Sequence, residues 1–350
     1  MRIAFAIGVA FSLAALPIAG ASELVPVPKQ AAAEVAPDSI QLYSDKQERM
    51  TVDVMVNGSG PFPFIVDTGA QRTVIARELA GRLFLKDGPR GKVHSMGGSE
   101  MVNTVIIPQL AVGEIKATRV VAPALSQFNV GSLGIIGLDM LKSRSMQLDF
   151  HTGSMALTPS VKPGDDWEGE SIIVSARSRL GQLILTNAKI EGDDVVVIID
   201  TGSDTSVGNS ALRKRLDARR AANPITGTTA IQMLDITGNI TDLDYTIVDH
   251  LRIASLDFSN LPVAFADAHM FKILGLQRTP ALLLAMDALR LFGRVTVDFG
   301  TRTVRFDRLP PGVKNKTRAS VQTLDQPPVQ TPSGQTLPGE TPPVQTPPVQ

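Results

Sequence analysis

The segments PFIVDTGA (residues 63–70) and VVVIIDTGS (residues 195–203) each run from apolar residues into the tripeptide Asp-Thr-Gly. A short apolar run that ends in turn residues predicts a buried strand. Each strand would therefore bring a carboxylate, that of Asp67 or Asp200, to its buried end, where an isolated ionised group is unfavourable. Two such carboxylates facing each other would share one proton and offer an acid and a base to the same water molecule. The repeated tripeptide indicates that Asp67 and Asp200 form a catalytic pair.

The surroundings of the tripeptide are repeated as well. GIIGLDML (residues 134–141) and MQLDF (residues 146–150) follow the first copy, and ALLLAMDAL (residues 281–289) and VTVDF (residues 295–299) follow the second. A tight turn would explain one Asp-Thr-Gly without any chemistry, but it does not explain the shared order of four segments. We infer an internal duplication over roughly residues 42–157 and 172–306, which covers most of the chain.

These two repeats resemble the aspartic protease superfamily, and Ala70 after the first Asp-Thr-Gly is most similar to its retropepsin-like branch. The resemblance implies an all-β fold of two pseudo-twofold-related retropepsin-like β-barrel lobes, with few short helices and the active site in the cleft between the lobes. It implies hydrolysis of a peptide or protein substrate by activated water, with no cofactor and no metal. It also implies that the catalytic loops are supported by Thr68, Gly69, Ala70, Thr201, Gly202 and Ser203.

The halves differ close to the catalytic loops. Ala285 stands where the first repeat has Gly137, and its extra methyl group is expected to shift the second loop slightly. Ser203 follows the second Asp-Thr-Gly, and we expect its hydroxyl to donate to Asp200 and favour the ionised form of that carboxylate. Gly69 and Gly202 are expected to allow close backbone approach and unusual φ angles.

The two repeats are expected to bind substrate through different residues. Asp204 matches a position at which retropepsins bind the substrate backbone. Two Gly-containing segments, residues 94–100 and 232–239, are candidate flaps over the cleft, and Met96, Gly97 and Gly98 are candidate substrate-binding residues. Ordinary hairpin turns are the alternative interpretation of both segments.

Composition excludes several other kinds of site. The chain has no Cys, so thiol catalysis and disulfides are excluded, and its four His residues show no metal-ligand spacing. With 34 basic and 34 acidic residues, the balance of charge gives no reason to expect a nucleic-acid partner.

Residues 1–21 have the pattern of an export signal: Arg2 near the start, an apolar stretch, and the small residues Ala19-Gly20-Ala21. A membrane anchor is the alternative, but the stretch is near the short limit for a span, and a cleavage site follows it at once. We therefore expect removal of the signal, no stable membrane span in the mature protein, and a bacterial periplasmic or secreted location.

Composition also divides the rest of the chain. Residues 22–39 are predicted to be a mobile N-terminal segment, residues 40–160 the first lobe and residues 161–308 the second lobe. Residues 309–350, with repeats such as Thr-Pro-Pro-Val-Gln, are predicted to be a disordered Pro-rich tail. This tail is interpreted as a solvated spacer, with docking to an envelope partner as the alternative.

Local patterns predict a few elements in detail. Residues 50–56 alternate with period two and end at Asn57-Gly58, which predicts a strand and a hairpin turn. Helices are predicted over residues 77–83 and 210–222, with Ser210 as the N-cap of the second. The basic residues of the second helix are expected to form a solvated face.

The leading hypothesis is an exported aspartic endopeptidase that works as a monomer, because one chain carries both halves of the pair. A catalytically inactive relative that binds extended peptides is the first alternative. An envelope interaction protein that acts through its Pro-rich tail is the second, but it leaves the two aspartates unexplained.

Overall fold

The computed structural model describes residues 12–13, 39–41, 43–44, 50–160, 171–220 and 229–308. All of these residues lie in one compact unit that extends over Met1–Thr317. Most of the expected signal sequence (1–21), nearly all of the N-terminal segment (22–39) and the whole Pro-rich tail (309–350) lie outside the described residues. No helix among the described residues combines the length and apolar character needed to cross a bilayer.

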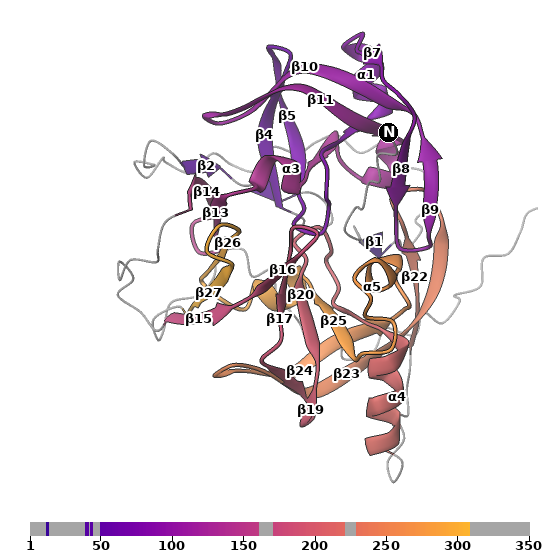
Figure 1. Cartoon of the computed structure of the whole chain (residues 1–350), viewed down its shortest axis with the longest axis vertical. Helices are drawn as coiled ribbons and strands as arrows, with labels where there is room; N and C mark the ends of the chain where they lie inside the picture. Colours follow the sequence, from indigo (N-terminus) through magenta and orange to yellow (C-terminus); the bar gives the residue numbers. More distant parts are fainter. Residues whose placement is uncertain are drawn as a thin grey trace, which may run out of the picture. The chain divides into compact units, whose positions relative to one another are not determined.

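The first repeat forms an eight-stranded sheet with the order β3-β4-β5-β12-β6-β11-β10-β7, and β4 also pairs with β10 (Figure 1). We call this sheet and its helices the first lobe. A separate two-stranded hairpin, β8–β9, extends from it. The strands are β3 (Tyr43–Ser44), β4 (Met50–Val56), β5 (Ser59–Val66), β6 (Val74–Ala76), β7 (Lys86–Asp87), β8 (Gly91–His94), β9 (Ser99–Val102), β10 (Thr104–Val112), β11 (Ile115–Leu125) and β12 (Gly134–Ile136), and the helices are α1 (Arg77–Arg82), α2 (Gln127–Val130) and α3 (Leu138–Leu141).

The second repeat, together with the short strand β1 from the N-terminal part of the chain, forms an eleven-stranded sheet, which with its helices is the second lobe. Its main path has the order β1-β22-β23-β24-β21-β25-β20-β17-β16, and β18 and β19 pair beside β23. The strands are β1 (Ser12–Leu13), β16 (Arg177–Arg179), β17 (Gln182–Leu185), β18 (Ala188–Ile190), β19 (Asp193–Asp194), β20 (Val196–Ile199), β21 (Val207–Gly208), β22 (Thr229–Leu234), β23 (Ile240–Ile253), β24 (Leu256–Phe265) and β25 (Ala281–Leu284), and the helices are α4 (Ser210–Arg219), α5 (His269–Ile273) and α6 (Met286–Leu289).

A third sheet joins the two repeats, and we call it the interlobe sheet. Its six strands have the order β15-β27-β26-β13-β14-β2, and the central β13–β26 pair aligns Met146 with Val297 and Leu148 with Val295. The apolar alternation of both repeats is thereby buried in one shared sheet. The strands are β2 (Ser39–Gln41), β13 (Arg144–Asp149), β14 (Ser154–Pro159), β15 (Ser171–Ser175), β26 (Arg294–Asp298) and β27 (Thr303–Asp307). The all-β fold with few, mostly short helices is confirmed.

Equivalent strand crossings position the two Asp-Thr-Gly loops. In the first lobe, β12 runs parallel to β5 and antiparallel to β6; in the second, β25 runs parallel to β20 and antiparallel to β21. The N–H groups of Asp67 and Asp200 complete these ladders, each donating over 3.0 Å to the carbonyls of Ile136 and Leu284 respectively. Each aspartate therefore begins its loop where a buried strand ends.

The local predictions are confirmed in part. Strand β4 has the predicted bounds, and Asn57 (φ 50°) and Gly58 (φ 78°) form the predicted tight turn. The N-cap prediction for α4 is wrong. Asn209 is the cap, because its side chain accepts from the N–H of Leu212 over 2.9 Å, whereas the hydroxyl of Ser210 donates to Asp267.

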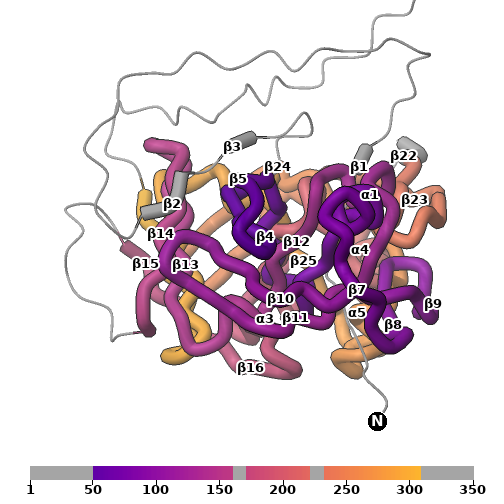
Figure 2. The backbone as a smooth tube through the Cα atoms, turned by 90° about the horizontal axis from the view of Figure 1, so that it is seen from above, coloured from indigo at the N-terminus to yellow at the C-terminus, as the bar shows by residue number. Residues whose placement is uncertain are grey.

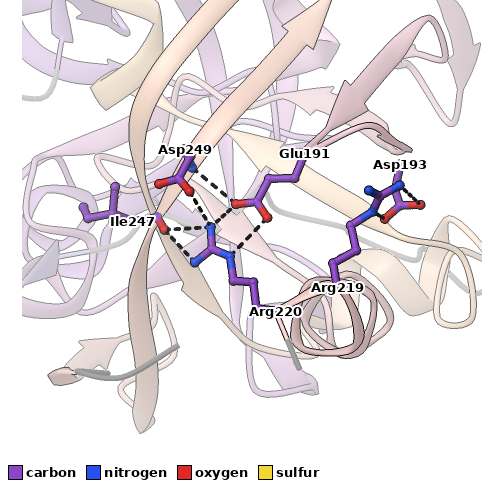
Figure 3. Close-up of polar contacts among 6 residues, drawn as sticks. All are labelled: Glu191, Asp193, Arg219, Arg220, Ile247 and Asp249. Carbon is purple, nitrogen blue, oxygen red and sulfur yellow. Dashed lines mark hydrogen bonds and ion pairs between the residues drawn. The ribbon is translucent and has the colours of Figure 1, made fainter. Parts of the chain in front are cut away.

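The expectation of a solvated basic face on α4 is also wrong for its C-terminal end. Figure 3 shows that Arg219 pairs with Asp193 and that Arg220 reaches Glu191, Asp249 and the carbonyl of Ile247. Only 17% of the Arg220 side chain and 12% of the Glu191 side chain are exposed. These ion pairs hold the end of α4 against strands β18, β19 and β23.

We predict that Arg220→Met lowers the free energy of unfolding by about 1–3 kcal/mol, because Glu191 would remain nearly buried without its cation. Arg215→Met, on the exposed face of the same helix, should change it by less than about 0.5 kcal/mol. Urea denaturation of both variants measures the difference. Equal small effects would show that Arg220 is only a surface charge.

Candidate active site

Asp67 and Asp200 are both buried, with 0% and 1% of their surfaces exposed. Each carboxylate is held by the backbone of its own loop. The Oδ1 atom of Asp67 accepts from the N–H groups of Gly69 (2.6 Å) and Ala70 (3.0 Å), and Oδ1 of Asp200 accepts from the N–H of Gly202 (3.0 Å). Donors of this kind stabilise a carboxylate away from water.

Thr68 and Thr201 tie the two loops to each other. The N–H of Thr68 donates to Oγ1 of Thr201 over 3.0 Å, and the N–H of Thr201 donates to Oγ1 of Thr68 over 3.1 Å. Each hydroxyl then donates into the opposite lobe: Thr68 to the carbonyl of Ile199 (2.9 Å) and Thr201 to that of Val66 (2.8 Å). Both side chains are buried, so the four hydrogen bonds link the lobes directly beside the aspartates.

Gly202 shows how closely the loops approach. A Cβ atom added to Gly202 would lie 2.2 Å from Cγ of Asp67 and 2.4 Å from both of its carboxylate oxygens. The Asp67 carboxyl group therefore rests on the backbone of the other catalytic loop, two residues after Asp200. The expected need for an unusual φ is not met here, because the glycines with positive φ lie elsewhere, for example at Gly58 and Gly98. Space, rather than φ, requires glycine at position 202.

Two buried carboxylates on interlocked loops favour a state in which one is protonated and the other ionised. The ionised group can take a proton from water, and the protonated group can donate one to a carbonyl oxygen. The arrangement is thus suited to the addition of water to a peptide bond.

Two hairpins meet near this site, one from each lobe. The first hairpin (β8–β9) and the second hairpin (β22–β23) touch at their tips, where the N–H of Gly97 donates to Oδ2 of Asp235 (3.2 Å) and the hydroxyl oxygens of Thr237 and Ser95 lie 3.2 Å apart. In Figures 1 and 2 the β8–β9 hairpin lies beside α5, and the N–H of His269 in α5 donates to the carbonyl of Met96 (3.0 Å).

Each hairpin also inserts an apolar side chain among residues of the other lobe. Met96 packs in a buried cluster that includes Ile198 and Leu283 of the second lobe. Ile236 packs in a cluster that includes Val74 and Ile135 of the first lobe. This reciprocal packing covers the ends of the strands that carry the catalytic loops.

A histidine pair supports the first hairpin. His94 stacks on His269 with ring centroids 4.9 Å apart and 11° between the planes. Burial, the neighbouring His269 and Lys92 lower the pKa of His94 to about 4, and burial, Lys272 and Lys92 lower the pKa of His269. His94 therefore stays neutral in mildly acidic solution, so the two rings do not both become charged there.

Asp235 organises the tip of the second hairpin. Its Oδ1 accepts from the backbone N–H groups of Thr237 (2.9 Å) and Asn239 (3.0 Å) and from the Thr237 hydroxyl (2.7 Å). Burial acts to raise the pKa of Asp235, but hydrogen bonds, above all those of Thr237 and Asn239, outweigh it and hold the pKa below its usual value. The carboxylate remains ionised and keeps the tip in one conformation.

Two protein-family models match the chain in tandem, one for each lobe. A model of gag-polyprotein aspartyl proteases matches residues 52–143, and a model of aspartyl proteases matches residues 186–288. The chain belongs to the retropepsin-like aspartic proteases. Each matched segment contains one Asp-Thr-Gly loop, and the protein is an aspartic-type peptidase. A search of curated proteins gave no significant match.

This aspartic protease has a glycine in only one of the two equivalent positions behind its catalytic loops. A Cβ atom at Gly137 would lie 2.5 Å from the backbone carbon of Arg72 and 2.9 Å from the carbonyl oxygen of Ala70. Ala285 has nearly the same backbone angles (φ −102°, ψ −171°) as Gly137 (φ −103°, ψ −175°). Its methyl group is accommodated with the equivalent hydrogen bond intact, from the N–H of Met286 to the carbonyl of Ser203 (3.0 Å).

We predict that Gly137→Ala lowers the free energy of unfolding by roughly 1–3 kcal/mol and reduces peptidase activity, because the new methyl group would push the backbone behind Asp67. The reverse change, Ala285→Gly, should cost about 1 kcal/mol and leave activity nearly intact. Urea denaturation and peptide cleavage by both variants test this asymmetry. Equal losses in the two variants would contradict it.

Asp139 and Asp287 support the catalytic loops from α3 and α6. Asp139 accepts from the N–H (2.9 Å) and hydroxyl (2.9 Å) of Thr73, and Asp287 accepts from the N–H (2.8 Å) and hydroxyl (2.6 Å) of Ser206. Burial raises the pKa of Asp139 despite the hydrogen bonds from Thr73. Burial likewise raises the pKa of Asp287, to about 6, against the hydrogen bonds from Ser206.

This pKa of about 6 lies above the ordinary 3.8, so the folded protein binds the Asp287 proton more tightly than the unfolded chain. The resulting stabilisation is fully present below about pH 4 and is lost as pH rises through 6. A shift of this size corresponds to about 3 kcal/mol.

We therefore predict that Asp287→Asn becomes more stable relative to wild type as pH rises from 4 to 7, because the amide cannot ionise. Urea denaturation across this range measures the trend, and Asp194→Asn, a surface change, is the control. Parallel stability curves for Asp287→Asn and wild type would contradict the prediction.

The structure changes the role expected for Ser203, which directly follows the second Asp-Thr-Gly. The Ser203 hydroxyl donates to the carbonyl of Thr205 over 3.0 Å, so its single proton is not directed at Asp200 as expected. Serine hydroxyls commonly bond to backbone groups a few residues away, as here. Asp204 is half-buried, and its carbonyl accepts from the N–H of Asp287 over 3.2 Å.

Some residues of the site were missed by sequence reasoning. Asp139 and Asp287 occur at matching places in the two repeats, and that signal could have identified them as loop supports. Asp235 lies in the candidate flap of residues 232–239, but no role for its carboxylate was predicted from the sequence. Gln182 donates from β17 to the carbonyl of Gly69 over 2.5 Å, and no local pattern indicates this contact.

Proposed function

We propose that this aspartic protease is an exported endopeptidase in which Asp67 and Asp200 activate a water molecule between them. The observation that carries the proposal is the contact of the Asp67 carboxyl group with the backbone of the loop that bears Asp200. The threonine hydrogen bonds keep the two loops in this relation without a cofactor in the reaction. Because both aspartates belong to one chain, a monomer can complete the site.

In the proposed reaction, the ionised aspartate removes a proton from water as the water oxygen bonds to the peptide carbonyl carbon. The protonated aspartate donates its proton to the carbonyl oxygen, which gives a neutral tetrahedral diol. The diol collapses when the first aspartate returns the proton to the amide nitrogen and the second recovers one from a hydroxyl. The C–N bond breaks, a carboxylic acid and an amine leave, and no covalent enzyme intermediate forms.

The titration behaviour belongs to the pair of aspartates rather than to either one. Ser203 gives no reason to assign the ionised form to Asp200, since its hydroxyl is bonded elsewhere. The proposal therefore needs one proton on the pair and leaves its resting position unassigned.

An extended peptide would lie between the catalytic loops and the two hairpins. Met96, Gly97 and Gly98 at the tip of the first hairpin, together with Asp204, are the proposed substrate contacts. The tips are joined by hydrogen bonds and by reciprocal packing of Met96 and Ile236, so entry of a peptide requires them to separate. Two hairpins that close over the catalytic loops would enclose the middle of a substrate peptide rather than its end. An endopeptidase is therefore favoured.

Export is supported by the basic start, apolar stretch and Ala19-Gly20-Ala21 triplet of residues 1–21. A bacterial periplasmic or secreted location follows from this proposal. Fractionation of cells that produce the full chain, with N-terminal sequencing of the mature protein, tests it.

We predict that purified protein cleaves peptides and that Asp67→Asn and Asp200→Asn each reduce the rate by roughly 10²–10⁴-fold, because either change removes an acid–base partner. A pepstatin-like inhibitor should block cleavage. The control is Asp194→Asn, whose side chain is 88% exposed. An inactive peptide-binding relative would instead bind the library peptides, cleave none of them from acid to neutral pH, and be indifferent to these substitutions.

A further inference from the structure

Gln182 connects the second lobe to the catalytic loop of the first. It begins β17, only 1% of it is exposed, and its Nε2 donates to the carbonyl oxygen of Gly69 over 2.5 Å. Gly69 is the last residue of the first Asp-Thr-Gly. The contact therefore reaches the Asp67 loop from a strand more than a hundred positions further along the chain.

Stability does not explain a glutamine at this place. The following residues of β17, Leu183 and Ile184, are buried and apolar. Among the described residues, the Oε1 atom of Gln182 is buried with no hydrogen-bond partner. An unsatisfied buried acceptor is unfavourable, and an apolar side chain of similar size would avoid it. The donor group of Gln182, rather than its packing, is the feature that the site uses.

The Gly69 carbonyl belongs to the same peptide group as the N–H of Ala70. That N–H donates to Oδ1 of Asp67 over 3.0 Å. Gln182, the peptide group and Asp67 thus form a continuous chain of hydrogen bonds. Donation to the carbonyl end of a peptide group polarises it and strengthens the hydrogen bond made by its N–H end.

We propose that Gln182 is a positioning residue for Asp67: through the peptide group between Gly69 and Ala70, it aligns the Asp67 carboxylate and stabilises its ionised form. Gln182 acts through this peptide group and does not touch the reacting atoms. The inference rests on the proposed function of Asp67, and it assigns to the second lobe a role in tuning the aspartate of the first.

Other charged groups around Asp67 also affect its titration. Asp200 is the other member of the pair, and Arg72 follows in the same loop and interacts electrostatically with Asp139. Substitution of Gln182 changes none of these charges. A shift in titration on removing the neutral amide therefore reports on the hydrogen-bond chain.

The test compares Gln182→Met, which keeps the length of the side chain and removes the donor, with wild type and with Gln109→Met, a change at an exposed residue of β10. We expect the acid limb of the pH–kcat/KM profile of Gln182→Met to move up by about half a pH unit. We also expect kcat to fall about 10-fold while KM stays within about 2-fold, because alignment rather than substrate contact is lost. The control should match wild type.

Gln182→Glu gives a second test. Its carboxyl group can donate to the Gly69 carbonyl only while protonated, so activity relative to wild type should be highest at acid pH and fall as pH rises. An unmoved acid limb in Gln182→Met, or a KM change without a kcat change, would overturn the proposal.

A readout that needs no activity separates this proposal from the proposed function. The ¹³Cγ signal of Asp67, assigned with Asp67→Asn, can be titrated in wild type and Gln182→Met. If the titration midpoint of Asp67 is higher in Gln182→Met, the positioning role of Gln182 is supported. This holds even if wild type cleaves no peptide, in which case only the proposed function fails. If the titration midpoint of Asp67 is the same in both proteins, the positioning role of Gln182 is refuted, even if wild type is a protease.

Discussion

The reciprocal hydrogen bonds between Thr68 and Thr201 are the constraint on which the rest of the site depends. Each threonine uses its hydroxyl as an acceptor for the opposing N–H and as a donor to a strand of the opposing lobe. The loops cannot separate without leaving these buried groups unsatisfied, which is unfavourable for each one. Two carboxylates that would otherwise repel each other are thereby held on adjoining backbone, which is the arrangement that the proposed shared protonation requires.

The repeats are alike in topology but unequal in detail. Both loops are formed by the same strand crossing, and both are supported by an aspartate from a short helix, Asp139 or Asp287. Gly137 packs directly on backbone, whereas Ala285 has room for a methyl group. Gln182 reaches from the second lobe to the Gly69 carbonyl. A single chain can develop such differences because its halves mutate independently, and they allow the two aspartates to experience different surroundings.

The two hairpins add further reciprocal contacts between the lobes, close to the catalytic loops. Met96 and Ile236 each pack among residues of the other lobe, and Asp235 accepts from the N–H of Gly97. The low pKa of His94 keeps that ring neutral in mild acid, so the two stacked rings do not both become charged there. If the aspartate pair works with one proton, as proposed, hairpins that stay assembled in mild acid keep the site covered under those conditions.

Sequence alone determined the duplication and the all-β class and predicted Asp67 and Asp200 as the catalytic pair, because apolar strands that end in Asp-Thr-Gly are local patterns repeated in one order. It also predicted β4 and its Asn57-Gly58 turn, whose conformation depends on neighbouring residues. Only the tertiary structure decided the N-cap at Asn209, the acceptor of the Ser203 hydroxyl, the β13–β26 pairing and the reach of Gln182 to Gly69. These contacts join residues through space or choose among several nearby acceptors, and no local pattern specifies which partner the fold brings within hydrogen-bond distance.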